Sequence, residues 1–161
     1  MSSSDDTLIN ALKKRIPGYG AYREQEARRD DDRLTREFLV QRLGECKASM
    51  DRMGVSAVAS GNLDAPIVSE RLRTRVDLAQ SRLAAAMEGY AAWFSDRKVD
   101  AALLQQIAKL DENLVSLVDQ IQSLSSDEKH YRDSEPSELR DAIELLHQRI
   151  DRRHELLKHG V

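Results

Sequence analysis

The sequence predicts an all-α protein: an antiparallel four-helix bundle with coiled-coil-like packing, preceded by a short N-terminal amphipathic helix. Of its 161 residues, 33% are charged and only 4% are aromatic, a composition that favours helices over sheets. Apolar residues also recur at alternating spacings of three and four, which places them along one side of a helix. The length suits one domain. We place this domain at residues 19–161, after a segment of residues 1–18 that holds the short helix and a Pro-Gly hinge.

The clearest predicted helix covers about residues 99–124. Its apolar stripe is uninterrupted and contains Leu103, Ile107, Leu110, Leu114, Leu117, Ile121 and Leu124. A helix over about residues 67–94 precedes it and begins near Pro66, a residue suited to a first helical turn. Residues 95–100 between them contain neither Gly nor Pro, and we interpret them as a tight turn. The alternative is a single rod over residues 67–124, about 87 Å long at 1.5 Å per residue.

Two further helices complete the predicted bundle, one over about residues 19–53 and one over about residues 137–158. The first is expected to end at Gly54, and the second begins after Pro136. None of the four helices is apolar all round, so each must bury one stripe against another helix. One short connection and two connections of roughly twelve residues make an antiparallel bundle the simplest arrangement. The near-heptad spacing would also suit a homodimer or a larger assembly.

The first long helix is expected to project beyond the bundle, because its apolar stripe starts only at Leu34. Residues 23–37, here called the charged arm, mix arginines with acids four residues apart, as in Glu24 with Arg28 and Asp32 with Arg36. One interpretation is a solvated helix face, since exposed ion pairs contribute little. The other is a docking surface for a protein partner, because Arg is enriched at interface hot spots.

The N-terminal segment has the pattern of an amphipathic helix with a basic end. Its apolar face contains Leu8, Ile9, Leu12 and Ile16, its basic end is Lys13, Lys14 and Arg15, and Pro17 and Gly18 form the hinge. Such a helix could fold back onto the bundle, bind a groove in a protein partner, or lie on an anionic membrane surface. One turn of basic residues is less than the polybasic patch that stable membrane anchoring usually needs.

The stretch IPGYGAYREQEARRDDDRLTRE, residues 16–37, resembles a segment of uncharacterised bacterial helical proteins. Its form there is I-P-G-Y-x-x-Y-(R/K)-x-x-E-x-R-R-x-x-D-x-x-x-R-E. The resemblance implies a bacterial origin and a functional role for Pro17, Gly18, Tyr19, Tyr22 and the arginines. It implies no activity.

Composition excludes several classes of function. A net charge of −3 and a pI near 5.8 give no broad basic field, so we expect no nucleic-acid partner. No apolar run approaches the roughly 20 residues of a membrane span. The lone Cys46 forms no internal disulfide, and the start of the chain lacks the pattern of a secretory signal. We therefore expect a cytoplasmic protein, with the inner face of a membrane as the alternative location.

No pattern predicts catalysis, a cofactor or a metal site. Glu144 and His147 have the E-x-x-H spacing of di-iron helices, but the second such pair and the additional carboxylates are missing. His147, Asp151 and His154 share a helix face beside several arginines, which oppose a cation, so solvated histidines are the better interpretation. Cys46 lies in an apolar stripe and is expected to be a small buried hydrophobe.

We therefore predict a non-enzymatic helical adaptor or scaffold that binds a protein partner through its N-terminal helix and charged arm. The alternative is a peripheral membrane protein whose first helix binds anionic lipid while the coiled-coil body assembles. The residues predicted to bind the partner or the membrane are Leu8, Ile9, Leu12, Lys13, Lys14, Arg15, Ile16, Tyr19, Tyr22, Arg28 and Arg29.

Overall fold

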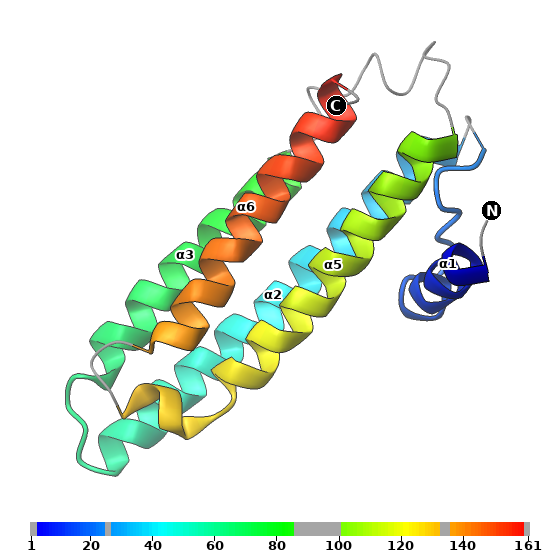
Figure 1. Cartoon of the computed structure of the whole chain (residues 1–161). Helices are drawn as coiled ribbons and strands as arrows, with labels where there is room; N and C mark the ends of the chain where they lie inside the picture. Colours follow the sequence, from blue (N-terminus) through cyan, green and yellow to red (C-terminus); the bar gives the residue numbers. More distant parts are fainter. Residues whose placement is uncertain (1–2, 25–26, 86–100, 133–135, 160–161) are drawn as a thin grey trace.

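The computed structural model describes residues 3–24, 27–85, 101–132 and 136–159 of the chain (Figure 1). Its elements are α1 (Ser3–Arg15), α2 (Arg28–Ala59), α3 (Ala65–Ala85), α5 (Ala101–Ser125), the short 3₁₀ helix η3 (Glu128–Tyr131) and α6 (Ser137–His159). The described residues include no strand, and the predicted all-α class is confirmed. Within this part of the chain, no helix combines the length and the apolar character that crossing a membrane requires.

The four long helices lie side by side (Figure 1). α2 packs against α3 and α5, and α6 packs against the same two helices. The apolar stripes meet between the helices and form one core. Its residues include Leu39, Leu43, Met50, Leu72, Val76, Leu83, Ile107, Leu114, Ile121, Leu139, Ile143 and Leu146, all buried. The core therefore comes from the stripes that the spacing of apolar residues predicts.

α2 differs from its predicted bounds at both ends. It begins at Arg28 rather than near Tyr19, and it continues to Ala59 instead of ending at Gly54. Gly54 lies inside the helix because α3 passes close to it: a Cβ there would lie 3.1 Å from the Cβ of Ser69. The turn comes after Ala59, where Gly61 adopts a φ of +94° that favours glycine. The prediction mistook a glycine required by helix packing for a helix stop.

α3 and α5 are separate helices packed along α2. The guanidinium of Arg36 in α2 donates to the carbonyl of Leu83 near the end of α3. Arg153 in α6 bonds to Asp32 at the start of α2 and to Asp111 in α5. These contacts exclude a single straight rod over residues 67–124. The tight turn predicted at residues 95–100 lies outside the described residues.

The chain after α1 is not helical over residues 16–24. Ala21 and Tyr22 have φ values of +58° and +57°, in the left-handed region. Both residues are buried, as are Ile16 and Tyr19. α1 then packs mainly against α5. The N-terminal segment thus folds back onto the helices, one of the three arrangements that its amphipathic pattern allows.

Candidate functional site

The segment Tyr19–Tyr22 is fixed to the first turn of α2 by the carboxylate of Asp31. Asp31 accepts hydrogen bonds from the backbone N–H of Gly20, at 2.7 Å, and of Tyr22, at 2.8 Å. A Cβ at Gly20 would lie 2.9 Å from an oxygen of Asp31, so a larger residue would displace the carboxylate. Arg28 adds a bond from its Nε to the carbonyl of Tyr22, at 3.1 Å. These bonds support the left-handed backbone of Ala21 and Tyr22.

The two tyrosines direct their hydroxyl groups to one carboxylate in the core. Tyr22 Oη donates to Asp111 of α5 at 2.9 Å, and Tyr19 Oη donates to the same oxygen at 3.2 Å. Their rings meet edge to face, with centroids 5.9 Å apart and planes at 86°. The segment before α2 is therefore joined to α5 through side chains that lie 89 and 92 residues apart in the chain.

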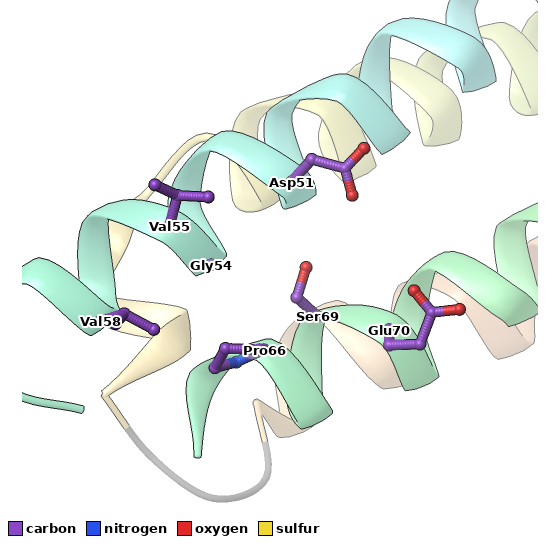
Figure 2. Close-up of a pocket in the computed structure, with 7 residues that line it drawn as sticks. All are labelled: Asp51, Gly54, Val55, Val58, Pro66, Ser69 and Glu70. Atoms are coloured by element: carbon purple, nitrogen blue, oxygen red, sulfur yellow. The ribbon is translucent and has the colours of Figure 1, made fainter. Parts of the chain in front are cut away.

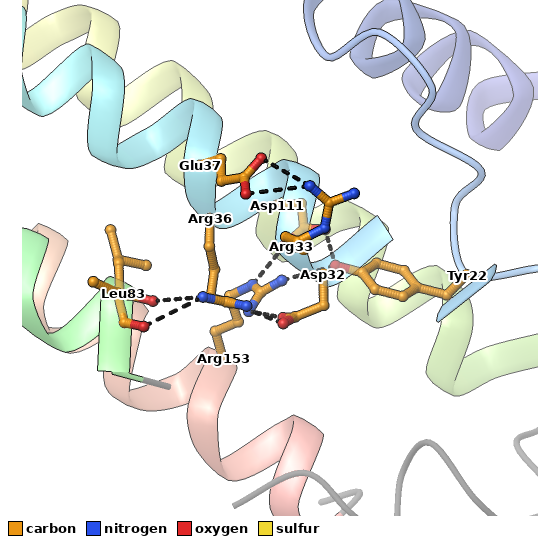
Figure 3. Close-up of polar contacts among 9 residues, drawn as sticks. Tyr22, Asp32, Arg33, Arg36, Glu37, Leu83, Asp111 and Arg153 are labelled. Atoms are coloured by element: carbon orange, nitrogen blue, oxygen red, sulfur yellow. Dashed lines mark hydrogen bonds and ion pairs between the residues drawn. The ribbon is translucent and has the colours of Figure 1, made fainter. Parts of the chain in front are cut away.

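Arg153 of α6 is the centre of this buried charge network (Figure 3). Its guanidinium donates from Nε to Asp111 at 2.9 Å, from Nη1 to Asp32 at 2.8 Å and from Nη2 to the hydroxyl of Tyr22 at 2.7 Å. Asp32 also accepts from Arg36 Nε at 2.8 Å. Arg36 in turn donates to the carbonyl of Leu83 at 3.2 Å, near the C-terminus of α3. The network joins the N-terminal segment to all four long helices.

The charges in the network balance, because two aspartates face two arginines. Asp32 and Asp111 are fully buried, and Arg153 is 2% exposed. Burial raises the pKa of Asp111, although Arg153 opposes the shift. Burial also disfavours the charged form of Arg153, but the neighbouring Tyr22, Asp111 and Asp32 outweigh it and raise its pKa. Buried ions need this pairing, since an unpaired charge in the core costs several kcal/mol.

The hydroxyl groups of Tyr19 and Tyr22 are held in hydrogen bonds inside the core. Burial raises the pKa of both Tyr19 and Tyr22, and the nearby Asp111 acts in the same direction. Tyr22 Oη donates a hydrogen bond to Asp111 and accepts one from Arg153. Such a paired arrangement positions the segment. We assign the network the role of an anchor for the base of the hinge.

The predicted binding face of α1 is covered by the protein's own helices. Ile9, Leu12 and Ile16 are buried, and Leu8 is partly buried against the core. The three basic residues at the end of α1 have different surroundings. Arg15 forms an ion pair with Asp119 of α5 and lies over the ring of Phe38 at 5.9 Å. Lys13 and Lys14 are exposed, as are Pro17 and Gly18 of the hinge.

The charged arm is not a solvated overhang, which corrects the expected projection of the first long helix. Its residues Arg28, Asp31, Asp32 and Arg36 are buried. The predicted pair of Asp32 with Arg36 is present, but it lies in the core. On the exposed surface of α2, Arg33 pairs with Glu37 at 3.3 Å, and Arg29 is also exposed. The alternating charges thus include both an interior and an exterior set.

Two members of the network escaped prediction, Asp111 and Arg153. A signal for them exists: Asp111 lies four residues after Ile107, and Arg153 lies three residues after Ile150, so each continues an apolar stripe with a charge. One aspartate and one arginine in facing stripes point to a buried pair. Five positions of the resemblance segment, Tyr19, Tyr22, Arg28, Asp32 and Arg36, take part in these contacts.

The histidine, aspartate and cysteine side chains that are sequence candidates for metal binding or catalysis lie in hydrogen bonds, ion pairs or the core. His147 contacts the Arg82 side chain and, through Nε2, the carbonyl of Arg75 at 3.0 Å, while Asp151 pairs with Arg82. In the ranges described, no group of three or more His, Cys, Asp or Glu side chains is placed to hold a metal ion. Cys46 is fully buried, as its apolar stripe predicts, and burial raises the pKa of its thiol to about 12.

No family model, no curated protein and no solved structure matches this chain. The functional interpretation therefore rests on the sequence and on the geometry of the N-terminal segment.

Proposed function

We propose that the protein is a non-catalytic adaptor whose α1 is a releasable binding helix held on a rigid scaffold. In this proposal α2, α3, α5 and α6 form an antiparallel four-helix bundle. The cross-contacts of α3 with α2 support that direction, because Ser69 bonds to Met50 and Gln80 bonds to Val40. As the residue number rises along α3, its partner's number falls along α2.

The observation that carries the proposal is the contrast across the hinge. On one side, Tyr19 and Tyr22 are tied into the buried charge network. On the other side, α1 is a separate amphipathic helix whose main contacts are with α5, and its Arg15 also lies over Phe38 of α2. Pro17 and Gly18 join the two parts, and Gly18 has a φ of +86°. The anchored tyrosines would keep the base of the hinge in place while α1 leaves α5.

Release of α1 would uncover an apolar face suited to a groove in another protein. Ile9, Leu12 and Ile16 are each buried in the docked state, and burying one such side chain is worth about 1.5–3 kcal/mol. A partner groove that buries the same face would compensate for most of the lost contacts, as in other helix-in-groove complexes. Binding and release are then alternative uses of one face.

The proposal can be tested by loosening α1 from the α5 side, which leaves the sequence of α1 unchanged. Asp119→Asn removes the carboxylate that pairs with Arg15 of α1 and, at 3.1 Å, with Arg42 of α2. Arg42 keeps its pair with Glu45, whereas Arg15 loses its ion pair to α5. Proteins captured specifically by the wild-type chain should be captured more efficiently by this variant and lost with Leu12→Asp, which places a charge in the binding face. Asp77→Asn is the matched control, because it breaks the partly exposed pair of Lys47 with Asp77 between α3 and α2.

The outcome that would overturn the proposal is capture that is indifferent to both Asp119→Asn and Leu12→Asp. Capture that Asp77→Asn changes as strongly as Asp119→Asn would also contradict it, since the effect would not be specific to α1.

The membrane alternative is favoured by one observation, the two exposed lysines at the end of α1. Flotation with neutral and anionic vesicles separates it from protein binding. If α1 is a lipid-binding helix, the full-length chain should float only with anionic vesicles, Asp119→Asn should increase the bound fraction, and Lys13→Gln with Lys14→Gln should reduce it. Absence of flotation in every arm would leave the protein-binding proposal in place and remove the alternative.

A further inference from the structure

The turn between α2 and α3 carries a concentrated apolar surface. Among the described residues, six large hydrophobic side chains are exposed, and four of them lie at this turn. They are Val55 at 73% exposure, Val58 at 37%, Leu63 at 77% and Ile67 at 55%. The remaining two, Leu78 and Leu145, lie farther along α3 and on α6. We call the four residues at the turn the turn cluster. Clustered exposure of this kind marks interaction surfaces more often than scattered single residues do.

A pocket opens beside the turn cluster because small residues form its floor (Figure 2). Gly54 and Ser69 allow α2 and α3 to approach closely, and the Ser69 hydroxyl is used in a bond to the carbonyl of Met50 at 2.9 Å. The pocket measures about 350 Å³. Val55, Val58 and Pro66 line one end, and the carboxylates of Asp51 and Glu70 lie at the other.

Charged side chains cover the groove between α2 and α3 up to the pocket and then stop. Lys47 pairs with Asp77 across the two helices. Nearer the turn, Arg73 bridges Asp51 at 3.7 Å and Glu70 at 3.6 Å. Beyond this bridge the pocket is lined by Val55 and Val58 of the turn cluster and by Pro66. The pocket is thus the place where the polar cover of the groove gives way to apolar surface.

The rim of the turn cluster carries charges of both signs in the same order on each helix. In α2 the exposed Asp51 is followed by the exposed Arg52, and in α3 the exposed Glu70 is followed by the exposed Arg71. Arg71 lies four residues after Ile67, on the same stripe of α3. An apolar centre with acids and arginines at its rim offers a second copy both signs of charge for pairing across a two-fold axis.

We propose that the turn cluster is a self-association surface and that its occupant is the turn cluster of a second copy of this chain. A two-fold contact buries the same aliphatic side chains twice and brings the acids of each rim to the arginines of the other. Closed two-fold dimers are the commonest protein assemblies. A partner with a basic surface would suit Asp51 and Glu70 but would face Arg52 and Arg71 with like charge, so the mixed rim favours a second copy.

The self-association proposal does not depend on release of α1. α1 lies beside the first half of α2, where Arg15 meets Phe38, away from the turn at the other end of that helix (Figure 1). A dimer formed through the turn cluster would leave α1 of each copy accessible. The same scaffold would then present two binding helices, which raises the apparent affinity for a partner with two sites.

Sedimentation equilibrium of the full-length chain over a range of concentrations tests the proposal. The wild-type chain should show a reversible monomer–dimer equilibrium. Val55→Asp and Ile67→Asp should each weaken the dimer at least about tenfold. Leu78→Asp is the matched control, because Leu78 is a 56% exposed residue of the same helix outside the turn cluster. It should leave the dimerisation constant unchanged.

Thermal unfolding of each variant shows whether the substituted chain still folds, and exposed positions should tolerate these changes. A wild-type chain that stays monomeric at every concentration would overturn the proposal, as would a dimer that Leu78→Asp weakens as much as Val55→Asp. Dimerisation that survives both substitutions in the turn cluster would assign the interface to another surface. Whether capture depends on Leu12→Asp and Asp119→Asn can be measured for a monomer as well as for a dimer, so failure here is distinguishable from failure of the proposed function.

Discussion

Arg153 Nε lies 2.9 Å from a carboxylate oxygen of Asp111, and both side chains are buried between α5 and α6. The same guanidinium reaches Asp32 on α2 and the hydroxyl of Tyr22. One arginine therefore sets the relative positions of three helices and of the segment that precedes α2. The N-terminal segment owes its place to this residue as much as to its own apolar side chains.

Replacing the central arginine should be strongly destabilising. Arg153→Met leaves Asp32 and Asp111 in the core with only Arg36 to balance them, and removing one partner of a buried ion pair typically costs about 3–5 kcal/mol. Urea unfolding measures the loss. Arg33→Met is the control, because it breaks an exposed pair with Glu37 on α2 and should leave the unfolding midpoint unchanged. Equal midpoints for the two variants would contradict the role assigned to the network.

The two tyrosine hydroxyls should differ in their contribution to stability. Tyr22 Oη makes two bonds, to Asp111 and from Arg153, whereas the bond of Tyr19 Oη to Asp111 is longer, at 3.2 Å. We expect Tyr22→Phe to cost about 1–3 kcal/mol, because Arg153 Nη2 loses its acceptor and Asp111 loses one of its donors in the core. Tyr19→Phe should cost less. The reverse order in urea unfolding would mean that the longer bond is the stronger one.

Gly20 should resist substitution for a steric reason. A Cβ at this position would lie 2.9 Å from Asp31 Oδ2 and would displace the carboxylate that holds the backbone of Gly20 and Tyr22. Loss of these bonds predicts a cost of about 1–3 kcal/mol for Gly20→Ala. Gly44→Ala provides the contrast: its Cβ would meet only Gln80 at 3.6 Å, inside α2. There, alanine should stabilise the helix by up to about 1 kcal/mol, and the sign of the change in unfolding free energy distinguishes the two sites.

Cys46 predicts a loss of stability at alkaline pH. Burial raises the pKa of its thiol from about 9 to about 12. Between these values the unfolded chain releases the thiol proton and the folded chain keeps it, so the free energy of unfolding must fall as pH rises. In Cys46→Ala the free energy of unfolding should fall less steeply with pH, because the thiol no longer contributes. The decline that remains comes from the buried tyrosines Tyr19 and Tyr22, whose pKa values burial also raises. In native buffer near neutral pH, a disulfide reagent should label Cys46 only through opening of the core, and rapid labelling would contradict its burial.

The helices were predictable because their apolar stripes repeat locally. The stripe from Leu103 to Leu124 lies wholly within α5, and α6 extends only one residue beyond its predicted end at Lys158. Gly54 misled the prediction, since a glycine demanded by the neighbouring Ser69 has the same sequence signature as a helix stop. Packing between helices cannot be read from one helix alone.

The anchor of the N-terminal segment was not predictable in the same way. Asp32 and Arg153 are 121 residues apart, and Tyr22 and Arg153 are 131 apart. Within the sequence, Asp32 belongs to a run of charged residues that would also suit a solvated helix. Its neighbours Asp30 and Arg33 are indeed exposed. Which of these charged side chains point into the core depends on partners from distant parts of the chain, and only folding brings them together. The charges that interrupt the stripes at Asp111 and Arg153 were the available signal.

Hydrogen exchange of the native full-length chain tests most directly whether α1 opens independently of the long helices. We predict that amides in the docked part of α1, up to Arg15, exchange through an opening well below the global free energy of unfolding, and that Asp119→Asn lowers this opening energy further. The amides of Gly20 and Tyr22, bonded to Asp31, should stay protected in both proteins. If the α1 amides exchange only with the core of α5, then α1 is a fixed part of the fold, and the releasable helix is contradicted.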